Sequence, residues 1–116
     1  MSNSIKKVRL PKKIQVKDVA YKTQMRTSHW SAHHRALGMC HFDKKLIELA
    51  DIQNNDELVD TYLHELLHSI IKEYELDVDG RSEEKLVTEL ANSLTDIFKN
   101  NKNLLLWIYK KLHGNT

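Results

Sequence analysis

One segment of the chain combines residue types and a spacing that can hold a metal ion and activate water. It reads His64-Glu65-Leu66-Leu67-His68, with two histidines four positions apart and a glutamate between them. On a helix the two imidazoles lie about 40° apart, one turn above each other, so both can bind a single tetrahedral zinc ion. Glu65 lies about 60° further round, where it can accept a proton from a water on the metal as a general base.

A catalytic zinc ion usually takes three protein ligands, so a third ligand must come from another part of the chain. The metzincin extension needs a glycine at position 71 and a histidine at position 74, but the chain has Ile71 and Tyr74, which excludes that class. His113 is a weak option because it lies at the end of a C-terminal helix. Cys40 or His41 would resemble a deformylase, although the surrounding residues do not match that family's cysteine motif.

The acidic candidates for the third ligand lie on a second helix, which we predict from Glu83 to Phe98. Its apolar arc, centred on Leu90 and Leu94, leaves Glu84 at the margin, where it can reach a neighbouring helix. Glu83 lies inside the arc on the first turn, and Glu89 points towards solvent. The periodicity therefore favours Glu84, then Glu83, then Glu89, and the helix dipole also stabilises a carboxylate in the first turn.

The elements that must position these groups follow from periodicity and capping residues. Asn54, Asn55 and Asp56 can cap a helix that carries the motif and runs to about Glu75. We expect its apolar arc, from Leu66 through Tyr74 to Ile71, to pack on a sheet and to leave the histidines facing a cleft. Ser82 can cap the second helix. We expect a last short helix, Leu104–Leu112, to cover the core, with dimer or partner contact as the alternative.

The first half of the chain is expected to form strands. Residues 14–16 and 19–25 are rich in β-branched and aromatic residues, and residues 39–42 and 46–50 form a hairpin pattern. Residues 26–37 show no period and are expected to be a loop. Strands followed by helices predict an α+β fold, with helices covering one face of a small sheet of three or four strands.

The amino-acid composition limits the classes of protein to which the chain can belong. The 116 residues are 41% hydrophobic and 29% charged, which is typical of one globular domain. We interpret residues 1–12 as a flexible basic lead-in and residues 13–116 as the domain. We expect no signal peptide and no membrane span, and the single cysteine, Cys40, suits a reducing cytoplasm.

Charge is unevenly distributed along the chain. The formal net charge is +2, but residues 1–30 hold eight Lys/Arg and one acid, whereas residues 31–98 hold six Lys/Arg and fifteen acids. A basic N-terminal segment can contact nucleic acid or an acidic partner, although a solvated basic edge is the more common explanation. The histidines at 29, 33, 34 and 41 could stabilise an oxyanion, but such residues more often lie on surface loops.

Two runs of the sequence resemble a known family. Thr61–Ile71 and Glu83–Leu94 are similar to the small gluzincin-type metallopeptidases, and most similar to the short phage- and prophage-encoded relatives of the ImmA/IrrE group. The hairpin Gly38–Ala50 is similar too, so the resemblance covers about residues 13–98. It implies a minimal zinc-peptidase fold acting in the cytoplasm, which for a phage protein is that of the host.

The resemblance also implies roles for individual residues. His64, His68 and a glutamate of the second helix would hold Zn²⁺, with Glu65 as the catalytic acid/base; the family pattern places the third ligand at Glu84. Larger members carry an acidic residue nearer their Ala-Asn pair, where Glu89 comes closest. The expected function is a zinc-dependent peptidase that hydrolyses a peptide or protein. The alternative is a zinc-stabilised regulatory module with little or no hydrolytic activity that binds protein or nucleic acid. The sequence does not specify the substrate or the oligomeric state.

Overall fold

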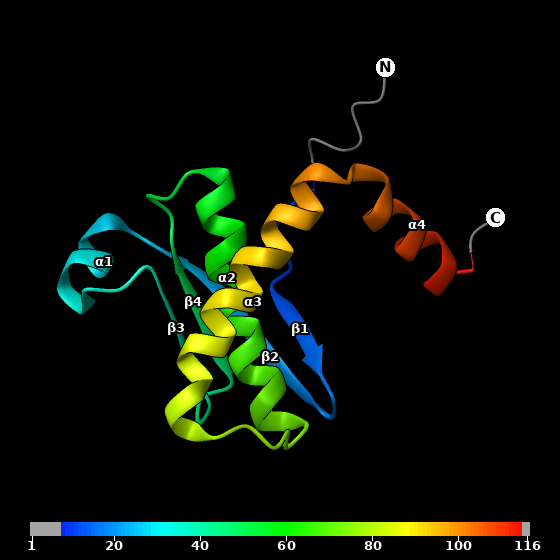
Figure 1. The fold of residues 1–116 in the computed structure, drawn as a ribbon. Coiled ribbons are helices and arrows are strands. Elements are labelled where there is room, and N and C mark those ends of the chain that lie inside the picture. Colours follow the sequence, from blue (N-terminus) through cyan, green and yellow to red (C-terminus); the bar gives the residue numbers. More distant parts are fainter. Residues whose placement is uncertain (1–7, 115–116) are drawn as a thin grey trace.

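A four-stranded mixed sheet forms the base on which the helices pack (Figure 1). The computed structural model describes residues 8–114, and in this part of the chain the strands are β1 (Lys13–Val16), β2 (Val19–Arg26), β3 (Gly38–His41) and β4 (Leu46–Ala50). Their order in the sheet is β1-β2-β4-β3. The central strands β2 and β4 are parallel, and the other two pairs are antiparallel, so β1 and β3 are the edge strands.

The helices of residues 8–114 are α1 (Ser28–His34), α2 (Asn55–Glu73), α3 (Gly80–Asn100) and α4 (Lys102–Leu112). Figure 1 shows α2 lying along the sheet, α3 crossing over α2, and α4 extending away from the body. The predictions of an α+β fold, of the first two strands and of the 39–50 hairpin are confirmed. Within the described residues, none of the helices has the length and apolar character needed to span a bilayer.

The core lies between the sheet and one side of α2. Its buried residues come from three strands and are Val16, Tyr21, Ile47 and Leu49. From α2, the residues that pack against them recur every four positions and are Leu58, Tyr62, Leu66 and Ile70. The predicted apolar arc of this helix is therefore wrong in part, because Tyr74 is exposed. α2 packs against α3 as well as the sheet, so its apolar residues are divided between two contact surfaces.

Two hydrogen bonds connect the sheet region to the C-terminal end of α2. The Tyr21 hydroxyl donates a hydrogen bond to Glu73 Oε2 at 2.6 Å, and Lys45 donates to the same oxygen at 2.9 Å. Burial, together with the Glu73 hydrogen bond, raises the pKa of Tyr21. The phenol therefore stays neutral and remains a donor at ordinary pH.

Three expectations about the elements are wrong. Residues 26–37 contain α1 rather than only loop; the Thr27 side chain caps this helix and Arg35 ends it in the left-handed conformation. Seven residues are too few to show a helical period. α3 begins at Gly80 under an Asp79 cap instead of after Ser82, so it starts about one turn earlier than expected.

The third error concerns the last helix, which was expected to cover the core. α4 contains no buried residue, and its main packing partner in the described part of the chain is α3. Asn101 alone separates the end of α3 from the start of α4. With so short a connection, α4 starts where α3 stops and continues beyond the edge of the core (Figure 1).

Close approach of β3 to α2 depends on Gly38. A Cβ atom at this position would lie 2.5 Å from Thr61 Cγ2 and 3.3 Å from Glu65 Cγ. Only a hydrogen therefore fits between the edge strand and the helical turn that precedes and includes the histidine–glutamate motif.

We expect Gly38→Ala to lower the free energy of unfolding by about 1–3 kcal/mol, because the added methyl must displace Thr61 or the strand. Urea denaturation followed by circular dichroism measures the effect. Gly80→Ala is the matched control, since its Cβ would meet no atom within 4 Å. We expect the control to change stability by less than about 0.5 kcal/mol. Equal stability of the two variants would contradict the close contact.

Candidate metal centre

The histidines of the motif occupy the middle of a well-capped helix. Asn54 accepts a hydrogen bond from the backbone of Glu57, and the Glu57 side chain accepts one from the backbone of Asn54, which forms a capping box. The capping box fixes where the helix begins, and His64 and His68 lie on the side of α2 that meets the first turn of α3. Both imidazoles are mostly buried.

Three side chains converge on one point between α2 and α3. His64 Nε2 and His68 Nε2 are 3.2 Å apart. The two oxygens of Glu84 lie 3.0 Å from His64 Nε2 and 2.9 Å from His68 Nε2. Among the described residues, these three also form a group whose potential ligand atoms all lie within 4.8 Å of one another.

The donor set fits a divalent cation of the zinc type. With bonds of 2.0–2.1 Å, neighbouring ligands of a tetrahedral zinc ion are about 3.3 Å apart. The observed separations are slightly smaller, and those to Glu84 involve its two different oxygens, so the three side chains would need to shift to take up tetrahedral positions. Two imidazoles and one carboxylate are also a ligand set that zinc accepts. The Glu84 side chain is 70% exposed, which leaves one side of the group open to solvent.

A second carboxylate, that of Glu83, contacts His68 on the side of the ring opposite the convergence point. Glu83 Oε2 lies 2.7 Å from His68 Nδ1, the ring nitrogen that faces away from the convergence point. A carboxylate on one imidazole nitrogen fixes the ring orientation and makes the other nitrogen a better ligand. Burial opposes the charged form of His68, but the hydrogen bonds to Glu83 and Glu84 outweigh it and raise the pKa of the imidazole.

Glu65 lies beside this group but points to the sheet side of the helix. It is only 9% exposed, and its side chain approaches Gly38 on β3. Burial raises the pKa of Glu65, against the opposing effects of His64 and His68. The glutamate of the motif is therefore enclosed and adjacent to both histidines, and it does not belong to the converging set.

The site opens into a cleft between β3 and the start of α3. Its volume is about 480 Å³, and its lining residues are Cys40, Phe42, Glu65, His68, Gly80, Glu83 and Glu84. One wall is thus formed by an edge strand and the other by acidic side chains.

The residues considered as a third metal ligand occupy different places in the structure. Glu84 joins the two histidines, and Glu83 contacts only the outer nitrogen of His68. Glu89 lies elsewhere and pairs with Lys85. His41 is turned towards Glu48, with His41 Nε2 2.6 Å from Glu48 Oε1.

The remaining predicted histidines lie outside the site. His113 packs against Tyr109 at the end of α4. The neighbouring histidines of α1, His33 and His34, pack against each other on that helix. Sequence reasoning missed the contact from Glu83 to His68 Nδ1; the only sequence feature pointing to it was the Glu83-Glu84 pair, which offers two carboxylates in one turn.

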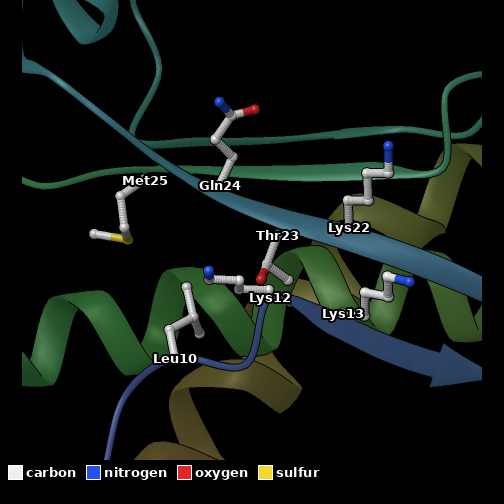
Figure 2. Close-up of a pocket in the computed structure, with 7 residues that line it drawn as sticks. All are labelled: Leu10, Lys12, Lys13, Lys22, Thr23, Gln24 and Met25. Carbon is white, nitrogen blue, oxygen red and sulfur yellow. The ribbon is translucent and has the colours of Figure 1, made fainter.

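A second surface feature is a basic groove beside β2. Figure 2 shows its lining, with Lys13 and Lys22 at one end and Lys12 closer to the Leu10 and Met25 end. Thr23 and Gln24 complete the lining, and the volume is about 520 Å³. The lining of this groove thus contains three lysines and no acidic side chain.

Comparisons of the chain with protein-family models, with curated proteins and with solved structures found no match. The resemblance to the ImmA/IrrE group therefore stays a prediction.

The thiol at the cleft provides a test of the site's electrostatics. Burial, reinforced by the nearby charge of Glu65, raises the pKa of Cys40 to about 12. The thiolate fraction of Cys40 should increase about tenfold per pH unit from pH 8 to 11, whereas that of an ordinary thiol levels off above about pH 9.

We therefore expect iodoacetamide to alkylate Cys40 on the order of 10²-fold more slowly at pH 8 in the folded chain than in the urea-unfolded chain. Mass spectrometry of timed samples measures both rates. Similar rates in the two states would show that the thiol is neither enclosed nor opposed by Glu65.

Proposed function

We propose that the chain is a metal-dependent peptidase. The observation that carries this proposal is the convergence of His64, His68 and Glu84 on one point, with Glu65 enclosed beside them. No other group of three or more ligand-type side chains in residues 8–114 comes as close together. The spacing of the motif predicts the same chemistry independently.

The three converging residues would hold the cation. A divalent ion such as Zn²⁺ supplies Lewis acidity, which polarises a carbonyl and lowers the pKa of water to about 7. Co²⁺ and Mn²⁺ also suit imidazole and carboxylate ligands. Glu83 would keep His68 in the orientation and tautomer that turn its Nε2 towards the ion.

Glu65 would carry the proton transfers. Its enclosed carboxylate can take a proton from a water molecule that attacks the substrate carbonyl, and then give it to the leaving amine. Gly38 supports this role because the absence of a side chain lets the strand lie against Glu65. Enclosure also excludes bulk water from the proton donor and acceptor.

An extended peptide is the substrate class that fits the cleft. β3 is an edge strand in the described sheet, and its free side carries backbone groups that have no ladder partner there. A substrate backbone can pair with such an edge, with alternate side chains entering the cleft. Phe42 provides an apolar contact at this wall.

Metal analysis and one substitution test the proposal. We expect purified chain supplied with Zn²⁺ to retain about one equivalent after dialysis, and His64→Ala to retain less than half an equivalent. Glu65→Gln should keep the metal and lose about 10²–10⁴-fold in cleavage rate, because only the proton acceptor is removed. Elemental analysis and a set of fluorescence-quenched peptides provide the two measurements.

Glu89→Gln is the matched control, since it removes a carboxylate that pairs with Lys85 outside the site. It should change neither metal content nor rate. Full activity in Glu65→Gln would refute the base assignment. A wild-type chain that holds metal but cleaves none of the peptides would favour the binding module over the peptidase.

The basic groove supports a second candidate function, in which a metal-stabilised chain binds nucleic acid. Lys12, Lys13 and Lys22 line one groove without an acidic neighbour in its lining. Phosphate backbones bind such surfaces, and the affinity falls steeply with salt because counterions are released.

For this candidate we expect a short DNA duplex to bind at 50 mM salt and to be released at 200 mM. Changing Lys12, Lys13 and Lys22 to Gln should reduce the salt slope by about three phosphate contacts. Changing Lys44, Lys72 and Lys85 to Gln removes equal charge outside the groove and should have a smaller effect. Fluorescence anisotropy gives both slopes; equal losses, or no binding at low salt, would remove nucleic acid as the partner.

A further inference from the structure

α4 is apolar on almost every side, yet none of its residues is fully buried against the rest of residues 8–114. Leu104–Tyr109 are six consecutive apolar residues. Trp107 is 59% exposed and Leu112 is 77% exposed. A helix that is apolar all round normally lies inside a protein, because leaving such side chains in water forfeits the hydrophobic stabilisation of the fold.

The exposed apolar surface continues onto α3. Leu86, Leu90 and Ile97 lie on one face of that helix, and all three remain exposed while Val87 and Ala91 are fully buried. Together with Leu105, Leu106, Trp107, Tyr109 and Leu112, eight large side chains are about half exposed. At roughly 200 Å² for each side chain, the five on α4 alone expose about 600 Å², against the roughly 800 Å² that each partner buries in a standard protein interface.

The same chain has an apolar groove that is suited to receive a helix. It lies between β1 and the C-terminal half of α2, with a volume of about 440 Å³. Its apolar lining consists of Ile14, Val16, Leu66, Ile70, Tyr74 and Leu76. An amphipathic or apolar helix can place side chains at positions i, i+3, i+4 and i+7 into a groove of this kind.

Charge at the two surfaces is complementary. The last turn of α4 carries Lys110 and Lys111, and the helix has no acidic residue. The groove reaches Tyr74 and Leu76, and the acids Glu75 and Asp77, their direct neighbours in the chain, are exposed. One lysine, Lys17, lies over the Tyr74 ring at 5.9 Å, so the two acids outnumber this single basic group. Opposite charges at the end of a groove fix the direction in which a helix enters it.

The short connection argues against each α4 filling the groove of its own chain. Two antiparallel helices that pack together need a loop of about two to five residues, but Asn101 alone joins α3 to α4. The Asn101 side chain also donates a hydrogen bond to the Ile97 carbonyl, which holds the connection against the end of α3. Figure 1 shows α4 directed away from both β1 and α2.

We propose that two copies of the chain form a symmetric dimer in which α4 of each copy lies in the apolar groove of the other. Lys110 and Lys111 of one copy then face Glu75 and Asp77 of the second. Exchange of one element about a two-fold axis is self-complementary and closes at two copies. The dimer stands apart from the proposed peptidase activity, because none of the groove residues belongs to the metal centre.

Sedimentation equilibrium of the full chain tests the dimer. We expect a mass of twice 13.6 kDa at micromolar concentration. Changing Lys110 and Lys111 to Glu should raise the dissociation constant at least about tenfold, since like charges would then face each other. Changing Glu75 and Asp77 to Lys in the same chain should restore it to within about threefold of the original.

Two controls keep the result interpretable. Lys44→Glu with Arg81→Glu makes the same change in net charge at exposed sites outside both surfaces, and should leave the dissociation constant unchanged. Circular dichroism should show a folded chain in all variants, with at most the helix signal of the eleven residues of α4 lost where the dimer dissociates. A monomer at all concentrations overturns the proposal. So does a dimer whose dissociation constant is unchanged when Lys110 and Lys111 are changed to Glu. Loss of the dimer without rescue by the second pair places α4 on another surface and also overturns it.

Discussion

The packing of α2 between the sheet and α3 is the constraint on which both the core and the candidate site depend. One side of the helix buries Leu58, Tyr62, Leu66 and Ile70 against the strands. That burial fixes the rotation of the helix, and the rotation directs the imidazoles of His64 and His68 towards the first turn of α3. The apolar contacts therefore determine where the polar chemistry can occur, since rotating the helix by one residue would move both sets together.

The same packing brings an unusual number of acids close to two imidazoles. Glu83 and Glu84 contact opposite nitrogens of His68, and Glu65 lies enclosed beside the pair. Carboxylates gathered in a half-buried place repel one another and are stabilised by a positive charge among them. A divalent cation would supply that charge at the point where Glu84 and the histidines meet, while Glu83 would hold the ring and Glu65 would remain available for proton transfer.

The order in which the described helices stack explains the surfaces that remain exposed. The sheet is covered mainly by α2, and α3 packs on α2, so α4 has no further layer to join. The apolar residues of α4 and the groove beside β1 are left without partners within the described chain. Association with another chain can cover such surfaces, because an interface removes apolar area from water.

The sequence by itself determined the class of the fold, the strands 14–16 and 19–25, the helix that carries the motif and the pairing of His64 with His68 on one side of it, because these depend on periodicity and capping over a few residues. It also ranked Glu84 first among the acids, which agrees with the position of that residue beside the two histidines. Tertiary structure alone decided the rest. The face of α2 that meets the sheet, the contact from Glu83 to His68 Nδ1 and the projection of α4 depend on residues far apart in the chain, and α1 is too short for its period to be visible.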